Sequence, residues 1–314
     1  MSEPNEGARR PRGGTVRANG LDVAYEERGH GEPVLLVAGI GMQLVSWPEG
    51  FLDALAARGL RVIVSDHRDI GRSTWLDEAG VPPVLRLLPR AVLGLPVRAP
   101  YTLFDMAADV AGLASALGLA RAHVVGVSMG GMVAQALAVT HGERLASLTS
   151  MMSHPGGHLL TTGLPHATLK LLAPAPRTRA AAIARQVDFF RTAGSPGFAR
   201  DDAEIAARAG RAYDRAFHPA GFARHFAAVL ATGDLSRRLA HVEVPTLVLH
   251  GQADPIIRAA RGRATARAIP GAQLRILEGW GHDLPPGAFD TLADAVAAHV
   301  HAHPCRPDQR RTFS

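Results

Sequence analysis

The sequence predicts an α/β fold with a mainly parallel, doubly wound sheet of eight strands and an inserted helical cap. Apolar runs of strand length alternate with helix-like segments up to residue 152 and again after residue 239, an alternation typical of βα units around a parallel sheet. Residues 153–238 interrupt it with several helical stretches and no convincing strand, so we interpret them as the cap. A chain of 314 residues is long enough for such a core and cap.

Composition and pattern set the predicted boundaries. Residues 1–14 are polar and rich in Arg, Pro and Gly, and we expect a disordered leader there. We expect a disordered tail at residues 303–314. The core is predicted over residues 15–152 and 239–302, with the cap at 153–238 between them.

The predicted sheet begins with a hairpin, because Asn19-Gly20 is a favoured two-residue turn between two short strands. The later strands are continuous apolar runs, as expected for strands buried on both faces. The predicted strands are 15–18, 21–27, 33–38, 61–65, a run from about 122, 145–152, 246–250 and 273–277.

Helical spacing predicts the connecting elements. Core helices are expected at 47–58, 101–119, 132–138, 258–269 and 289–300, and cap helices at 167–172, 177–193, 201–217 and 222–231. Residues 79–100 alternate prolines with leucines, which is too broken for a long helix. We expect an ordered excursion there with one short helix, packed under the cap near the mouth of the site.

A Gly-x-Ser-x-Gly pattern, formed by Gly126, Ser128 and Gly130, stands between an apolar run and a helical pattern. A nucleophile elbow requires this strand–turn–helix context. Glycines fit beside the serine because a Cβ there would collide with neighbouring backbone. The Ser128 hydroxyl would then lie at the carboxyl end of a central strand, where such sheets carry their active sites. Alone, the pattern also fits an ordinary Gly-rich turn.

Two later strand ends supply the partners that a serine nucleophile needs. Asp254 lies in His-Gly-Gln-Ala-Asp-Pro (250–255), and His282 lies in Gly-Trp-Gly-His-Asp (279–283). A serine hydroxyl needs a base, and that base needs a third group to orient it. We expect His282 to be the base and Asp254 the orienting acid. The backbone N–H groups of Met129 and Ile40 are the expected oxyanion donors.

The order Ser, Asp, His is that of α/β-hydrolases, and the chain resembles that superfamily from about residue 20 to 300. More closely, it resembles the carboxylesterase-like branch that includes the aclacinomycin methylesterases. The matching stretches include residues 38–43, Asp-His-Arg-Asp-Ile-Gly-Arg-Ser-Thr at 66–74, and the three motifs above. One departure is Ala38-Gly39, where His-Gly is frequent. Ser128 stands where the dehalogenase and epoxide-hydrolase branches attack with Asp, which argues against those branches.

Several other polar residues are expected to be structural. Asp69 and Arg68 are predicted to form an ion pair or to cap their loop, and Asp66 is not expected to be the catalytic acid. Asp283 is expected to face solvent or to contact the site indirectly. His250 is expected to be a hydrogen-bonding residue beneath the acid loop.

No cofactor and no metal site are expected. Cys305 is the single cysteine, and from this we infer that neither an internal disulfide nor a cysteine-based metal site is possible. His299, His301 and His303 lie on a predicted C-terminal helix that runs into a tail, and we do not expect them to bind metal.

Composition argues against several classes of partner. No apolar run reaches the roughly 18 residues needed to span a bilayer, so stable membrane insertion is not expected. The N-terminus lacks the apolar core of a signal peptide, so we expect a cytoplasmic location. The net charge is +6, but its arginines are scattered and no nucleic-acid-binding module is visible, so nucleic acid is not an expected partner.

We therefore predict a cofactor-free serine hydrolase, monomeric or homodimeric, that cleaves medium-sized, apolar carboxylic esters through an acyl-enzyme. Within enzymes, the alternatives are a methylesterase, a lactonase or a tailoring hydrolase of secondary metabolism, and a cofactor-free perhydrolase or C–C bond hydrolase. A non-catalytic binding protein on the same fold is the alternative from another class. The complete Ser/Asp/His set argues against it.

Overall fold

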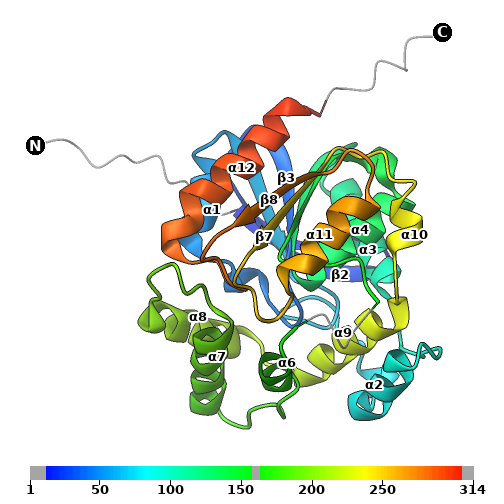
Figure 1. Ribbon diagram of the computed structural model, residues 1–314, viewed down its shortest axis with the longest axis vertical. Coiled ribbons are helices and arrows are strands. Elements are labelled where there is room, and N and C mark those ends of the chain that lie inside the picture. Colours follow the sequence, from blue (N-terminus) through cyan, green and yellow to red (C-terminus); the bar gives the residue numbers. More distant parts are fainter. Residues whose placement is uncertain (1–11, 158–162, 306–314) are drawn as a thin grey trace, which may run out of the picture.

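The computed structural model describes residues 12–157 and 163–305. Its eight strands form one sheet in the order β1-β2-β4-β3-β5-β6-β7-β8, in which β2 pairs antiparallel with β1 and β4 and all other pairs are parallel. The predicted fold class is confirmed (Figure 1). The strands are β1 (Arg12–Ala18), β2 (Leu21–Arg28), β3 (Glu32–Val37), β4 (Leu60–Ser65), β5 (Ala122–Val127), β6 (Leu145–Met151), β7 (Thr246–Gly251) and β8 (Gln273–Leu277).

Both ends of the chain differ from the prediction. Residues 12–14, expected in the disordered leader, pair with β2 as part of β1, while the rest of that leader lies outside the described residues. At the other end, the Cys305 N–H donates to the Glu32 carboxylate over 3.1 Å, so the start of the predicted tail contacts the sheet. Residues 306–314 lie outside the described part.

Helices cover both faces of the sheet (Figure 1). On one face lie α1 (Glu49–Ala56) and α12 (Phe289–Ala302), and on the other α3 (Leu103–Ala116), α4 (Met129–Thr140) and α11 (Ala259–Ala268). The two faces follow from the alternation of side chains along a strand. In β3, Val34 and Leu36 pack in the core beneath α1 and α12, whereas Leu35 and Val37 pack in the core beneath α3 and α4.

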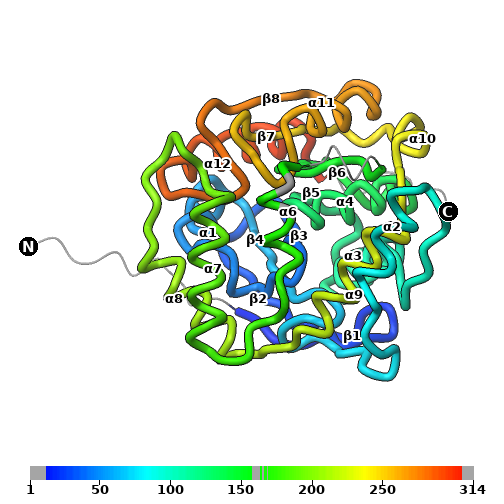
Figure 2. Tube along the Cα trace, turned by 60° about the horizontal axis from the view of Figure 1, so that its bottom comes forward, coloured from blue at the N-terminus to red at the C-terminus, as the bar shows by residue number. Residues whose placement is uncertain are grey.

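An inserted segment, α6 to α9, lies between β6 and β7. It consists of α6 (Pro165–Leu171), α7 (Arg179–Ala193), α8 (Asp202–Arg215) and α9 (Pro219–Thr232). Thr178 and Asp201 begin α7 and α8 by accepting hydrogen bonds from backbone N–H groups of the first turn. Figure 1 shows α6, α7 and α8 together beyond one end of the sheet. Figure 2 shows α9 running beside α3, which it contacts. Helix α10 (Ser236–Leu239) follows and extends past the predicted cap boundary at residue 238.

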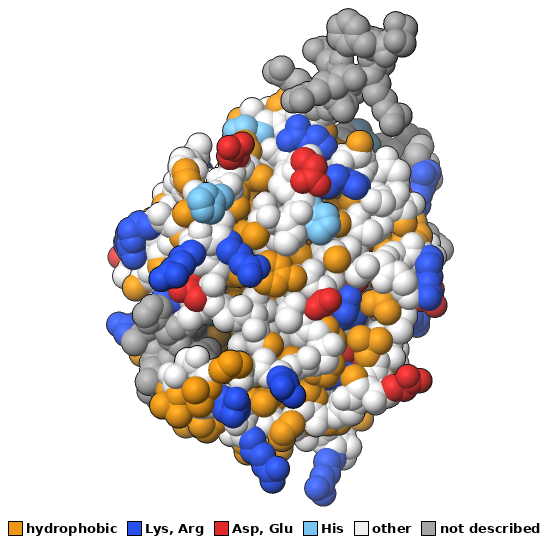
Figure 3. Space-filling view, turned by 90° about the vertical axis from the view of Figure 1, so that its right-hand side faces the viewer, with side chains coloured by type: hydrophobic (Ala, Val, Ile, Leu, Met, Phe, Trp, Pro, Cys, Tyr) orange, Lys and Arg blue, Asp and Glu red, His pale blue; other side chains and the backbone are white. Residues whose placement is uncertain are grey.

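Residues 79–100 contain one short helix, α2 (Val84–Val92), which packs on α9 and has Pro89 inside it. The expected contact with the inserted helices is therefore present through α9. The stretch is not enclosed beneath them, however, because no residue of α2 is buried and Leu85 and Leu93 are 75% and 71% exposed. Figure 3 shows the side of the molecule that lies on the right in Figure 1, where α2 is found, and hydrophobic side chains gather at its lower end. Four 3₁₀ turns complete the described elements, at Leu44–Ser46, Asp77–Ala79, Gly142–Arg144 and Pro286–Ala288.

No helix in the described ranges combines the length and the apolar character needed to cross a membrane.

Candidate active site

Ser128 lies in the sharp turn between β5 and α4. Its backbone has φ 55° and ψ −122°, a conformation that side chains other than glycine rarely adopt. A Cβ at Gly126 would overlap the Gly130 carbonyl, and a Cβ at Gly130 would overlap the Val37 carbonyl, so both positions require glycine. The turn is fixed on its other side because the Ser128 N–H donates to the Met151 carbonyl over 2.9 Å.

Asp254 lies in the loop after β7 and is buried. Its Oδ1 accepts hydrogen bonds of 2.8 Å from the backbone N–H groups of both Ile256 and Ile257, which fixes the carboxylate plane. His250 lies beneath this loop, where its Nε2 donates to the Ile257 carbonyl over 2.6 Å. Burial lowers the pKa of His250, which keeps it a neutral hydrogen-bonding residue. The structure thus places His250 in the position expected from the sequence.

His282 lies in the loop between β8 and α12 and joins the other two residues. Its Nδ1 is 2.7 Å from Asp254 Oδ2, and its Nε2 is 3.0 Å from Ser128 Oγ. A carboxylate only accepts hydrogen bonds, so Nδ1 carries the proton and Nε2 is left to accept from the serine hydroxyl. The three residues predicted from separate strand ends therefore form one hydrogen-bonded chain.

Asp283 follows His282 but points away from this chain. Its carboxylate accepts a hydrogen bond from the Ser195 hydroxyl, and Ser195 Oγ accepts from the Gly281 N–H over 2.8 Å. Burial raises the pKa of the Asp283 carboxyl. Of the two sequence-based expectations, the structure excludes a solvent-facing side chain. Asp283 instead connects the loop of His282 to the stretch between α7 and α8.

The loop after β3 contributes free backbone donors. Neither the Ile40 N–H nor the Met129 N–H has a hydrogen-bond partner among the described residues. Gly39 keeps this loop close to the elbow, since a Cβ there would stand 3.0 Å from Met42 Sδ and 3.5 Å from Ser128 Cβ. Both expected oxyanion donors therefore belong to segments next to Ser128.

Two buried histidines hold this loop, and sequence reasoning did not assign them this position. His67 Nε2 donates to the Ala38 carbonyl over 2.9 Å. His225, from α9, donates through Nε2 to the Arg68 carbonyl over 2.8 Å and accepts through Nδ1 from the Gly41 N–H over 3.4 Å. Burial lowers the pKa of His67, and that of His225 to about 3, so both rings are neutral at pH 7.

Of the two expectations for Arg68 and Asp69, the ion pair between them is absent, whereas Asp69 does cap its loop by accepting from the Leu76 N–H over 2.7 Å. Asp69 also accepts two hydrogen bonds, of 2.8 and 2.9 Å, from Arg224 of α9 and one of 2.7 Å from the Tyr101 hydroxyl. Arg68 pairs with Asp109 of α3 at 2.6 Å. Asp69 has φ 68°. The Arg68 side chain extends to α3 and the Asp69 side chain to α9, so the two charges do not meet.

A second ion pair joins the inserted segment to the core. Arg215, at the end of α8, lies 2.6 Å from the buried carboxylate of Asp66. Beside it, the Gln43 amide donates to the carbonyls of Ala212 and Ala216 over 2.6 Å each. The Ala212 carbonyl also accepts from the Ala216 N–H over 3.2 Å, so the Gln43 amide adds a second bond there and supplies a partner to the carbonyl of Ala216, the residue that ends α8. Asp66 therefore has a structural partner set, and it is not part of the Ser128 chain.

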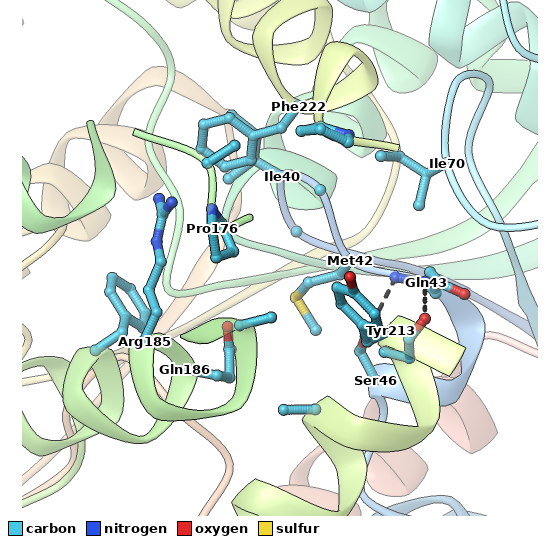
Figure 4. A pocket seen from close by; sticks show the side chains of 18 of the residues that line it. Ile40, Met42, Gln43, Ser46, Ile70, Pro176, Arg185, Gln186, Tyr213 and Phe222 are labelled. Carbon is cyan, nitrogen blue, oxygen red and sulfur yellow. Dashed lines mark hydrogen bonds between the residues drawn. The ribbon is translucent and has the colours of Figure 1, made fainter. Parts of the chain in front are cut away.

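A pocket of about 340 Å³ opens onto Ser128 and His282. Figure 4 places Arg185 and Pro176 on one side of it and Tyr213, Gln43 and Ser46 on the other. Most of the lining is apolar and comes from α7, α8, α9 and the loop after β3. Those apolar lining residues include Ile40, Met42, Ile70, Phe189, Phe190 and Phe222.

Arg185 is the unusual group in this lining. It donates to two backbone carbonyls, those of Pro174 at 2.7 Å and Leu171 at 3.4 Å, and has no carboxylate partner within the described chain. Burial lowers its pKa. Lys170 also lines the pocket, but it pairs with Asp188 at 2.7 Å. Arg185 is therefore a half-buried cation whose charge no side chain of the described residues balances.

The fold and the site together define an α/β-hydrolase, and comparison with known proteins agrees. The family model described as the alpha/beta hydrolase fold matches residues 32–286, so the chain belongs to this family. It is 30% identical over 292 residues to rhodomycin D methylesterase of Streptomyces peucetius, covering 86% of this chain and 91% of the relative. The resemblance to the methylesterase-containing branch is thereby confirmed.

Solved structures lead to the same fold. A hydrolase from Pseudomonas aeruginosa PA01 superposes with a TM-score of 0.68 at 26% identity, covering 91% of this chain and 97% of that one. A meta-cleavage product hydrolase from Pseudomonas fluorescens IP01 superposes with a TM-score of 0.70 at 19% identity, covering 93% and 98%. The latter similarity shows the fold alone.

Proposed function

We propose that this protein is a serine hydrolase that cleaves carboxylic esters through an acyl-enzyme. The observation that carries the proposal is the hydrogen-bonded chain from Ser128 through His282 to Asp254. In the first step His282 Nε2 takes the Ser128 proton as Oγ attacks the ester carbonyl. The same proton then goes to the leaving alcohol. In the second step His282 deprotonates a water molecule, which attacks the acyl carbon. The bond from that carbon to Ser128 Oγ then breaks, the proton passes from His282 Nε2 to Oγ, and the acid is released.

The free amides of Ile40 and Met129 support this chemistry. Each tetrahedral intermediate carries its negative charge on the former carbonyl oxygen, and backbone donors fixed in advance stabilise that charge. Loss of one such donor typically slows catalysis by about 10²–10³-fold. Buried His67 and His225 would keep the Ile40 loop in the position that this role requires.

The inserted segment, which we propose to act as a cap, would select the substrate. Its helices and the loop after β3 supply a mainly apolar lining, which favours medium-sized apolar acyl or alcohol groups. Arg185 adds one preference, because its cation would bind an ester that carries a carboxylate or another anionic group away from the reacting bond. The relative named rhodomycin D methylesterase supports ester hydrolysis, and methyl-ester cleavage is the narrower candidate that it favours.

The test combines turnover with active-site labelling. Ser128→Ala should abolish hydrolysis of p-nitrophenyl esters, and a fluorophosphonate probe should label the native protein at Ser128, as located by mass spectrometry of its peptides. Ser46→Ala is the matched control, because Ser46 also lines the pocket but lies in no hydrogen bond with His282. It should keep both turnover and labelling. Unchanged turnover in Ser128→Ala would disprove the proposal.

A further inference from the structure

Three side chains with metal-ligating atoms meet at the amino ends of the central strands, whereas the pocket lies beyond their carboxyl ends. Glu32 begins β3 and His123 lies near the start of β5, the strand whose other end leads to Ser128. Cys305 follows α12 and reaches the same place. One carboxylate oxygen, one imidazole nitrogen and the thiol sulfur all lie within 4.8 Å of one another.

His123 has a buried ring nitrogen without a hydrogen-bond partner among the described residues. It is fully buried, and its Nδ1 is 2.8 Å from the Ser147 hydroxyl. Its Nε2 points toward the cluster, 3.4 Å from Glu32 Oε2, but has no hydrogen-bond partner of proper geometry among the described residues. Leaving a buried polar atom without a hydrogen bond is costly, so this nitrogen is an unused ligand atom.

Cys305 is held beside it. Its backbone N–H donates to Glu32 Oε2 over 3.1 Å, and its thiol donates to the Arg121 carbonyl over 3.6 Å. Burial and the neighbouring Glu32 carboxylate raise the thiol pKa to about 12, so the sulfur is protonated when no cation is bound. A cation at this position would reverse that preference.

We propose that Glu32, His123 and Cys305 form a binding site for a divalent transition-metal ion of the zinc type. A neutral imidazole, a carboxylate and a thiolate are ligands that Zn²⁺ takes in proteins. On binding, the thiol proton leaves to solvent, and the two anionic ligands balance the ion's charge. The Ser147 hydroxyl on Nδ1 fixes the ring so that Nε2 faces the ion, as outer partners of metal ligands commonly do.

The spacing is close to what coordination needs. Tetrahedral Zn²⁺ with ligand distances of about 2.0–2.3 Å holds its ligand atoms roughly 3.3–3.8 Å apart. Glu32 and His123 already meet this spacing at 3.4 Å, and Cys305 needs a shift on the order of 1 Å. This proposal departs from the expectation that a single cysteine allows no cysteine-based metal site. The ligands are spread over 273 residues, and only the sheet brings them together.

The test uses the full-length protein after chelator treatment and dialysis. Titration with Co²⁺ should give one equivalent of bound ion and a near-ultraviolet thiolate-to-cobalt charge-transfer band, and Zn²⁺ should displace it. Cys305→Ser should lose the band and bind Zn²⁺ at least about tenfold more weakly, measured by competition with a chromophoric chelator. Ester turnover should not change, because the cluster lies at the amino ends of the strands and Ser128 lies at the carboxyl ends.

His301→Ala is the matched control, since His301 lies close in sequence but outside the cluster. It should keep the band and the affinity. His299 and His303, whose rings are 4.8 Å apart, are the competing ligand pair. If Cys305→Ser binds Zn²⁺ as tightly as the native protein, or if the cobalt complex lacks the thiolate band, the proposed site is wrong.

Discussion

His225 Nδ1 lies 3.4 Å from the backbone nitrogen of Gly41, so α9 of the inserted segment is hydrogen-bonded to the loop that follows β3. The ring is completely buried, and its other nitrogen is committed to the Arg68 carbonyl. The same loop carries the free N–H of Ile40. The position of one proposed oxyanion donor therefore depends on a side chain that lies 185 residues further along the chain.

Removing this imidazole should slow the chemical step. We expect His225→Ala to lower kcat for a short p-nitrophenyl ester by about 10–100-fold with a smaller change in KM, because a displacement of about 1 Å in catalytic geometry can cost that much. His225→Asn places an acceptor near the position of Nδ1 and should recover part of the loss. Equal losses of kcat in both variants, with normal melting temperatures, would contradict this role.

Replacing Asp254 should lower kcat far more than replacing Asp283, the residue that follows His282. Asp254→Asn should lower kcat by about 10³–10⁴-fold, because an amide can no longer force the proton onto His282 Nδ1. Asp283→Asn is the control, since its carboxylate bonds to Ser195 and not to the imidazole. It should keep most of the activity. Steady-state kinetics of both variants, with circular dichroism to verify folding, make the comparison.

The buried pair of Asp69 and Arg224 should stabilise the fold rather than the reaction. Asp69→Asn leaves the buried Arg224 guanidinium without its main counter-charge and should lower the free energy of unfolding by about 3–5 kcal/mol. Asp77 also contacts Arg224, at 3.1 Å, but its side chain is 62% exposed. Asp77→Asn should therefore cost much less. Equal losses for the two variants in urea unfolding would refute this ranking.

The unfolding free energy should fall as the pH drops below about 6.5. Burial lowers the pKa of His225 to about 3, whereas an unfolded histidine titrates near 6.5. Between these values the unfolded chain binds the proton and the folded chain does not, so stability is complete above pH about 6.5 and is lost on acidification. His225 alone should cost about 2 kcal/mol between pH about 7 and about 5. In His225→Asn the loss over that range should be smaller by this amount.

Arg185 should discriminate between charged and neutral esters of equal size. Arg185→Met should raise KM for an ester with a distal carboxylate by about 10–100-fold, the equivalent of one charge-assisted hydrogen bond. KM for the neutral analogue should hardly change. Arg191→Met on the same helix is the control, because Arg191 is exposed and pairs with Asp202. A parallel change in KM for both esters would show that Arg185 acts only in packing.

The sequence predicts best those features that are encoded locally. Gly126 and Gly130 indicate the sharp turn at Ser128, because only glycine fits at these two positions. The alternation of strands and helices is likewise a repeated local pattern. Asp254 and His282 were predictable because they follow strands, and parallel strands end at one edge of the sheet. Each of these inferences needs only neighbouring residues and a general rule about sheets.

The features that were missed depend on pairs distant in sequence. Arg224 and His225 lie in a helix predicted from its apolar spacing, and nothing local indicates that they reach Asp69 and Gly41. The only available signal was two adjacent polar residues in a largely apolar helix. The expected Arg68–Asp69 pair failed for the same reason, since adjacency in sequence did not bring the two charges together.

Ser128 occupies a backbone conformation that costs roughly 1–3 kcal/mol for a residue with a Cβ. A glycine at this position would remove the strain together with the hydroxyl, so Ser128→Gly should unfold at a higher denaturant concentration than the native protein while hydrolysing no ester. Thermostability and activity are thus opposed at this one residue. A search for more stable variants that does not also select for turnover would therefore tend to remove the proposed nucleophile.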